Sequence, residues 1–215
     1  MKKQITFLAL LCLPLLSFGQ KTGAHSYQID LTTVKNDQVK VTVDATAVGL
    51  GDAPSDIYSF HFPATIPGTY ATLDYGRFIH EFLAFDADGT VLKVKKSKNS
   101  YRIYGKPARL EYWAEDTFDA KIRKNKVFEP AGTNNQERRN FLLNHAGYFG
   151  FFEGQEELPV TLELLKSPTL YGISAMESYT YGNTQVFNAR NYHHFLDCPV
   201  MVSKPDTTSF KLGGA

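Results

Sequence analysis

The chain has 215 residues, of which 13% are aromatic, and its formal net charge is +1 at pH 7. Because the charge is nearly balanced, there is no electrostatic reason to expect binding to nucleic acid or to an anionic membrane. The length suits one domain with its own apolar core, and the aromatic content is typical of a β-rich protein.

Residues 1–19 have the pattern of a secretory signal peptide. Lys2 and Lys3 precede an apolar run over 5–16, and Ser17 and Gly19 supply the small residues of a cleavage site. The run is too short to span a bilayer comfortably, and no later stretch is apolar enough to do so. We expect an exported protein, periplasmic or secreted, with no membrane association after cleavage and a mature chain of 20–215.

Cysteine usage excludes a disulfide framework in the mature chain. Cys12 is removed with the signal peptide, so Cys198 remains alone. An exported domain without an internal disulfide must be held together by its apolar core. We interpret Cys198 as a small buried hydrophobic residue.

The mature chain alternates apolar and polar residues with a period of two, which predicts β-strands. The strands at 27–32 and 38–45 flank the turn signal Asn36-Asp37 and are expected to form a hairpin. Further strands are expected over 57–62, 78–85, 91–95, 99–104, 108–113 and 159–165. Turns at 86–89 and 105–107 favour a sequential meander. The expected fold is a mostly all-β antiparallel sandwich with long loops and at most one or two short helices, one of them over 138–145.

Two later segments break the alternation. Lysine and arginine residues cluster within 116–137, which we interpret as a solvated loop. The segment 144–154 places four aromatic residues among three glycines. These aromatic residues are Tyr148, Phe149, Phe151 and Phe152. They suit either a surface that grips a ligand or another domain, or a core between two sheets, and the core is favoured for two of the four.

The sequence argues against a metal site in this chain. A thermolysin-like site needs two histidines four residues apart on a helix, with a glutamate between them. His80-Glu81 lacks the second histidine, and its strand-like pattern places the two side chains on opposite faces. The adjacent His193 and His194 are also expected on opposite faces of a strand, which favours a structural role. We predict no metal ligand and no catalytic residue.

The segment 66–89 resembles a known family. It contains Pro67-Gly68-Thr69-Tyr70, then Asp74-Tyr75-Gly76-Arg77, then an alternating strand that closes on Asp86-Ala87-Asp88-Gly89. This order is similar to the N-terminal domain of the glycyl aminopeptidases, peptidase family 61. Similar segments follow at 101–104, 110–112, 144–154 and 192–199, so the resemblance covers nearly the whole mature chain. From chemistry alone, Pro67-Gly68 suits a type II turn and Arg77 an ion pair with a carboxylate.

The resemblance implies a β-rich N-terminal domain, then a thermolysin-like zinc domain, then a C-terminal peptide-binding domain. Enzymes of this family release N-terminal glycine or alanine from peptides. Their zinc and catalytic glutamate would belong to the middle domain, which is missing here, so no cofactor is expected in this chain. We expect Ala215 to mark a truncation, a fragment boundary or the end of a stand-alone domain.

Two functions remain open. The first is a non-catalytic N-terminal domain that packs on a zinc catalytic domain, in the same chain or separate, and shapes the peptide cleft. Its expected contact residues are Tyr148, Phe149, Phe151, Phe152, Tyr70 and Arg77. Such a domain should expose an apolar patch when isolated. The alternative is a free-standing exported module that binds peptide or glycan through aromatic side chains. Whether this chain has enzymatic activity alone is left open, because an independent enzyme would need polar groups converging in a pocket.

Overall fold

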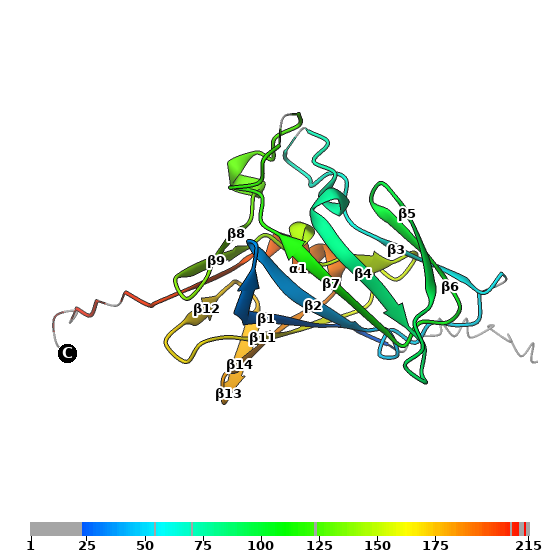
Figure 1. Cartoon of the computed structure of the whole chain (residues 1–215). Helices are drawn as coiled ribbons and strands as arrows, with labels where there is room; N and C mark the ends of the chain where they lie inside the picture. Colours follow the sequence, from blue (N-terminus) through cyan, green and yellow to red (C-terminus); the bar gives the residue numbers. More distant parts are fainter. Residues whose placement is uncertain are drawn as a thin grey trace, which may run out of the picture.

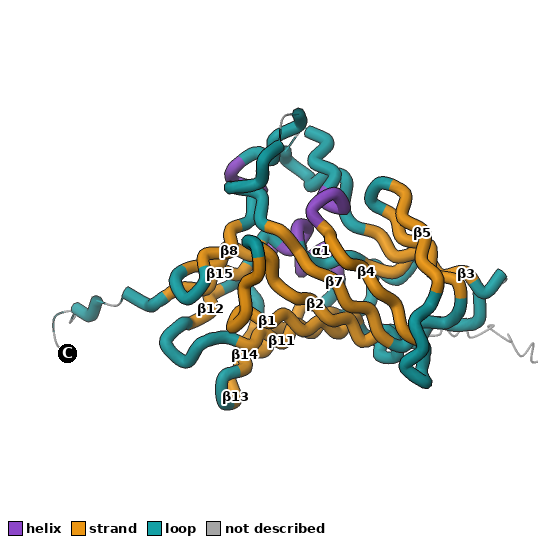
Figure 2. Tube along the Cα trace, viewed as in Figure 1, coloured by secondary structure: helices purple, strands orange, loops and turns teal. Residues whose placement is uncertain are grey.

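The structure is a computed structural model that describes residues 23–53, 55–69, 71–122, 124–206, 208–210 and 213. The expected signal peptide and Tyr70 lie outside the described residues. Strands dominate the described part of the chain, and its helices are few and short (Figures 1 and 2). This confirms the mostly β fold. No helix among the described residues is long and apolar enough to span a membrane.

The largest sheet has seven strands, and all but one of its neighbouring pairs are antiparallel. Its order is β13 (Glu177–Tyr181), β14 (Thr184–Ala189), β11 (Val160–Leu165), β1 (His25–Lys35), β2 (Gln38–Asp44), β7 (Arg109–Glu115) and β4 (Ile79–Phe85). The parallel pair joins β1 to β11, with His25 opposite Val160. The expected hairpin of β1 and β2 is confirmed. Asn36 and Asp37 form its turn with positive φ angles of 52° and 58°.

Two four-stranded sheets lie toward opposite ends of the large sheet (Figure 1). The second sheet has the order β10 (Phe151–Phe152), β3 (Ile57–His61), β6 (Ser100–Tyr104) and β5 (Lys93–Ser97). The third sheet has the order β12 (Tyr171–Ile173), β15 (Val200–Ser203), β9 (Asn140–Leu143) and β8 (Asn134–Gln136). One apolar cluster joins all three sheets, so they form a single core.

The expected meander is confirmed where Val91 bridges Phe85 and where β5 pairs with β6, but it does not continue as one sheet from β4 to β7. β4 pairs with β7 in the large sheet, whereas β5 and β6 pair with each other in the second sheet. The turns at 86–89 and 105–107 therefore carry the chain between sheets. Both connections satisfy the same local alternation as a meander, because the pattern specifies a buried face and not a pairing partner.

Two local predictions are also wrong. The expected helix at 138–145 is occupied by strand β9, because Arg138 turns the chain at a φ of 61° and Phe141 and Leu143 then alternate into the core. Residues around His193 form helix α1 (Tyr192–Asp197) instead of a strand. The side chain of Asn191 accepts a hydrogen bond from the backbone N–H of His194, which starts this helix. Short 3₁₀ helices cover Tyr75–Phe78 (η1), Glu129–Ala131 (η2) and His145–Gly147 (η3).

Three buried tyrosines, which we call the tyrosine clamp, hold residues 148–150 in the core. The clamp comprises Tyr27 of β1, Tyr112 of β7 and Tyr192 of α1. Their hydroxyl groups donate to the carbonyls of Gly150, Tyr148 and Phe149 at 2.5, 2.8 and 2.6 Å, respectively. A buried carbonyl must find a donor, and residues 148–150 have no neighbouring strand that supplies one. The clamp therefore replaces a strand ladder at this position.

Candidate functional site

Three connections meet at one end of the molecule, shown at the top of Figure 1. We call residues 63–69, 71–74, 116–122, 124–133 and 144–148 the apical loop cluster. The first begins where Pro63 and Pro67 prevent β3 from continuing. The expected type II turn is present: Gly68 has a φ of 87°, and the backbone N–H of Thr69 donates to the carbonyl of Ile66 at 3.2 Å.

The second connection, 116–133, is anchored at both ends. Asp116 is buried, and its carboxylate accepts from the backbone N–H groups of Asn135 at 2.9 Å and Asp119 at 3.3 Å. Burial raises the pKa of this carboxyl, while the two hydrogen bonds oppose the increase. At the other end, the side-chain amide of Asn144 donates to the carbonyl of Gly132 at 2.5 Å. These contacts fix where the loop leaves and rejoins the sheets.

Arg77 lies on η1, just after the first connection, and joins η1 to the second connection. Its guanidinium donates to the carbonyl of Lys124 at 3.2 Å and also to that of Asn125, and it lies over the ring of Phe78. The expected ion pair is wrong, because no carboxylate within the described residues forms a salt bridge with Arg77. The forked guanidinium instead satisfies two loop carbonyls. Arg77 is thus a positioning residue for the apical loop cluster.

Two hollows of the apical loop cluster lie beside exposed phenylalanine rings. The larger has a volume of about 440 Å³ and is lined by Thr117, Phe118, Ala120, Ile122, Lys126, Val127 and Glu129. The smaller has a volume of about 250 Å³, and its lining includes Pro67, Gly68, Phe128, Asn144 and His145. Phe118 and Phe128 are exposed, at 45% and 57% of their surface. The cluster therefore combines one hollow of mixed polarity and one more apolar hollow with solvent-facing rings on a fixed base.

Among the residues that line the smaller hollow, His145 is the only one with a titratable side chain, and it is buried. Its Nδ1 lies 2.5 Å from the carbonyl of Phe195, and its ring stacks on the Phe195 ring at 3.8 Å between centroids. Burial lowers its pKa to about 4, and the hydrogen bond to Phe195 opposes this decrease. The imidazole is therefore neutral near pH 7, with Nδ1 as the donor. Its Nε2 has no hydrogen-bond partner among the described residues.

A model of the Peptidase M61 N-terminal domain family matches residues 26–204. The chain belongs to this family. No curated protein is similar enough to count as a match. Among solved structures, an aminopeptidase N family protein from Idiomarina loihiensis superimposes with a TM-score of 0.66 at 20% identity, covering 83% of this chain and 29% of that one. An M1 zinc metallopeptidase from Deinococcus radiodurans gives a TM-score of 0.41 at 9% identity, covering 85% and 42%. The chain thus spans less than half the length of either.

The M61 N-terminal domain buries most of the predicted contact rings. Tyr148, Phe149 and Phe152 have at most 1% of their surface exposed, so no partner can reach them in this fold. Phe151 is partly buried against the ring of Tyr192. Three of the four rings are therefore in the core, whereas the sequence pattern favours the core for two. Whether Phe151 contacts a partner stays a prediction, and Tyr70 lies outside the described residues.

The structure exposes two aromatic rings that the sequence analysis does not select as contact residues. Phe118 and Phe128 lie in the segment interpreted as a solvated charged loop. The sequence does contain a signal for them. A large apolar residue in a charged loop without alternation has no sheet face on which to be buried, so it is a candidate for exposure. Only the folded arrangement shows that both rings of this loop stay exposed.

No metal centre forms in the part of the chain that the structure describes. No three His, Cys, Asp or Glu side chains there come close enough to hold an ion. His80 Nε2 instead lies 2.7 Å from the Glu115 carboxylate, and the β4 register shifts next to it. His193 lies 4.0 Å from Glu157, while the ring of His194 faces the backbone of Arg190. The two adjacent histidines therefore have separate structural contacts.

Proposed function

We propose that this chain is the non-catalytic N-terminal domain of an exported glycyl-aminopeptidase-like zinc metallopeptidase. It packs on a thermolysin-like zinc domain, in the same chain or separate, and its apical loop cluster shapes one wall of the peptide cleft. The family match supports the association with a peptidase. Among the described residues, no three potential metal-ligating side chains come together. Zinc and the catalytic glutamate belong to the partner domain in this proposal.

The observation that carries the cleft role is the fixed base of the apical loop cluster. Arg77, Asp116 and Asn144 hold the loops from below, while Phe118 and Phe128 remain exposed above. Ordered loops lose little conformational entropy when they bind a partner or a peptide. Exposed rings beside these hollows supply the contact area that peptide side chains need.

The test is aminopeptidase activity with glycyl and alanyl chromogenic substrates in the presence of zinc. It compares the 215-residue chain with the same chain joined to an M61 zinc peptidase domain. We expect activity only in the joined protein. Phe128→Ala should then raise KM about tenfold, the effect of losing about 1.4 kcal/mol of binding, while Val91→Ala, at an exposed site on the β4–β5 connection, should not. Zinc-dependent activity in the 215-residue chain alone would contradict the proposal.

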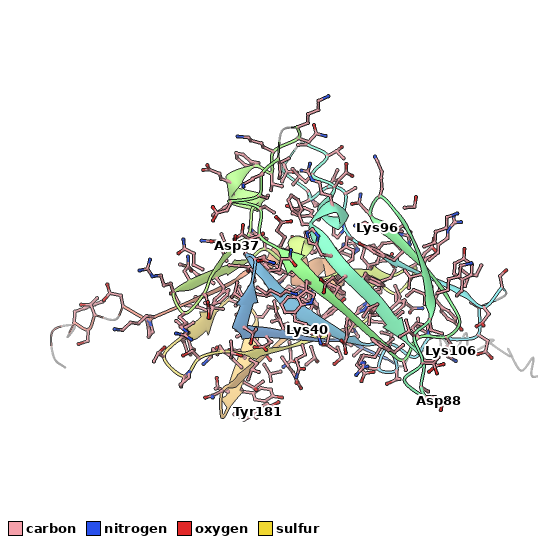
Figure 3. The ribbon with its side chains drawn as sticks, in the orientation of Figure 1. Asp37, Lys40, Asp88, Lys96, Lys106 and Tyr181 are labelled. Atoms are coloured by element: carbon pink, nitrogen blue, oxygen red, sulfur yellow. The ribbon has the colours of Figure 1, made fainter. Side chains whose placement is uncertain are left out.

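The alternative, a free-standing module that binds peptide or glycan, rests on a different surface. Tyr179 and Tyr181 are exposed on β13, and their rings lie 6.4 Å apart between centroids. Figure 3 shows Tyr181 at the free end of this strand. Binding of peptides or oligosaccharides that is lost in Tyr181→Ala, without any peptidase domain present, would favour the alternative.

A further inference from the structure

The third sheet has one face in the core and one face toward solvent. Phe141, Leu143, Val200 and Val202 point inward and are fully buried. The outward residues alternate with them along the four strands. They are Tyr171, Ile173, Met201, Ser203, Asn140, Leu142, Asn134 and Gln136. None of these outward side chains carries a charge.

Strand register arranges the outward side chains in rows. Ile173 lies opposite Met201, Met201 opposite Leu142, and Leu142 opposite Asn134. Three neighbouring strands therefore present an unbroken apolar row. Ile173 is 63% exposed and Met201 is 46% exposed, and Tyr171, at 51%, stands two residues before Ile173 on the same face. We call these outward residues the third-sheet face.

The outward faces of the other two sheets carry charged side chains. On the large sheet, Lys40 pairs with Glu111 at 2.8 Å, and Arg109 pairs with the same carboxylate group at 3.3 Å. On the second sheet, the exposed residues Lys95 and Arg102 lie opposite each other. Solvent-facing sheets normally carry such polar side chains. An uncharged outward face with exposed isoleucine, methionine and tyrosine has the composition of an interface core.

We propose that the third-sheet face is the surface on which the M61 zinc peptidase domain docks. This inference rests on the proposed function and deepens it by assigning the contact surface. The peptidase domain must present an apolar, uncharged surface here, because a charge buried against this row would find no partner. The side chains around Ile173 and Met201 then form the centre of the contact.

The path of the chain identifies this occupant. β15 lies within the third sheet, between β12 and β9, and the family match ends at residue 204, directly after β15. The chain leaves the described fold on this side (Figure 1). In the Idiomarina loihiensis structure, the matched fold occupies only 29% of the chain. The segment that follows β15 therefore leaves the fold beside this face.

The third-sheet face is also continuous with the apical loop cluster. β8 follows the connection 116–133 directly, and β9 leads into Asn144 of the smaller hollow. A rigid partner that binds the third-sheet face therefore also lies next to the apical loop cluster. The docking surface and the proposed cleft wall can therefore serve a single partner.

Methionine oxidation tests the proposal with an internal reference. Met201 is 46% exposed, whereas Met176 is 6% exposed, so dilute peroxide should oxidise Met201 before Met176 in the 215-residue chain. In the chain joined to the M61 zinc peptidase domain, we expect Met201 oxidation to slow by about tenfold or more, because interface cores pack as densely as interiors. Slow oxidation of Met176 in both proteins shows that the domain is folded.

The other results overturn the proposal. Equal oxidation of Met201 in the two proteins means that the peptidase domain does not cover the face. Protection in the 215-residue chain alone that grows with protein concentration means that a second copy covers it. Aminopeptidase activity in the joined protein without protection of Met201 overturns the docking surface and leaves the proposed function standing.

A matched pair of variants adds a second measurement. Ile173→Lys places a charge in the apolar row and should restore rapid oxidation of Met201 in the joined protein. Val91→Lys is the control, because Val91 is 58% exposed and lies just after Asp88, which Figure 3 shows at the opposite end of the molecule. Protection of Met201 that persists in Ile173→Lys would contradict the assigned centre.

Discussion

Tyr112→Phe tests whether the tyrosine clamp stabilises the core as the geometry implies. The substitution keeps the ring, which packs on Phe62 and Phe82, and removes only the hydroxyl that donates to the Tyr148 carbonyl at 2.8 Å. Tyr112 and Tyr148 have at most 1% of their surface exposed, so water cannot replace the lost donor. An unsatisfied buried carbonyl costs about 1–3 kcal/mol. We expect the free energy of unfolding to fall by about 2 kcal/mol within this range.

Urea unfolding and a thermal melt, both followed by circular dichroism, measure the effect. For a chain of this size, about 2 kcal/mol corresponds to a decrease in Tm of about 4–8 °C. Tyr171→Phe is the control, because its ring is 51% exposed on β12, and its effect should stay within about 0.5 kcal/mol. If Tyr112→Phe matched this control, the clamp would not stabilise the fold and the reasoning would be refuted.

Three further predictions concern the same core. Gly150→Ala should lower the free energy of unfolding by about 1–3 kcal/mol, because the new Cβ would lie 2.4 Å from the His61 carbonyl oxygen; Gly51→Ala, with nothing within 4 Å, is the control, and equal urea midpoints would contradict the clash. Burial lowers the pKa of His145 from 6.5 to about 4, so stability present above pH 6.5 should be lost as the pH falls toward 4, by up to about 3 kcal/mol. His145→Gln should flatten this acid slope in pH-dependent urea titrations, and an unchanged slope would assign it to other groups. Burial raises the pKa of all three clamp tyrosines, so the stability present below about pH 10 should be lost above it as the unfolded state ionises. Tyrosinate absorbance from the clamp should then appear only together with unfolding, and full ionisation in the folded protein would contradict its burial.

The local patterns of the chain predict its strands because a half-buried strand leaves a period of two in the sequence. The β1–β2 hairpin and the Pro67-Gly68 turn follow from adjacent residues, and both are present in the structure. The family was also visible from the order of short segments, and the match over 26–204 confirms it. The signal peptide and the boundary at 19/20 stay predictions.

The candidate site was less predictable, because its residues come from separate connections. Arg77 is a good ion-pair former in isolation, but the fold places loop carbonyls beside it, and no carboxylate among the described residues forms a salt bridge with it. His193 sits in a short region whose helix depends on the cap provided by Asn191. Phe128 gives no periodic signal, and its exposure follows only from how the loops meet.

By itself, the sequence determined which segments are extended, where several tight turns fall and to which family the chain belongs. These properties depend on neighbouring residues and on their order. Only the tertiary structure decided that β1 pairs in parallel with β11, that the chain divides into three sheets, and that the rings at 148–149 lie in the core. The reason is physical: alternation states that a strand has a buried face, while contacts between residues more than one hundred positions apart decide which surface covers that face.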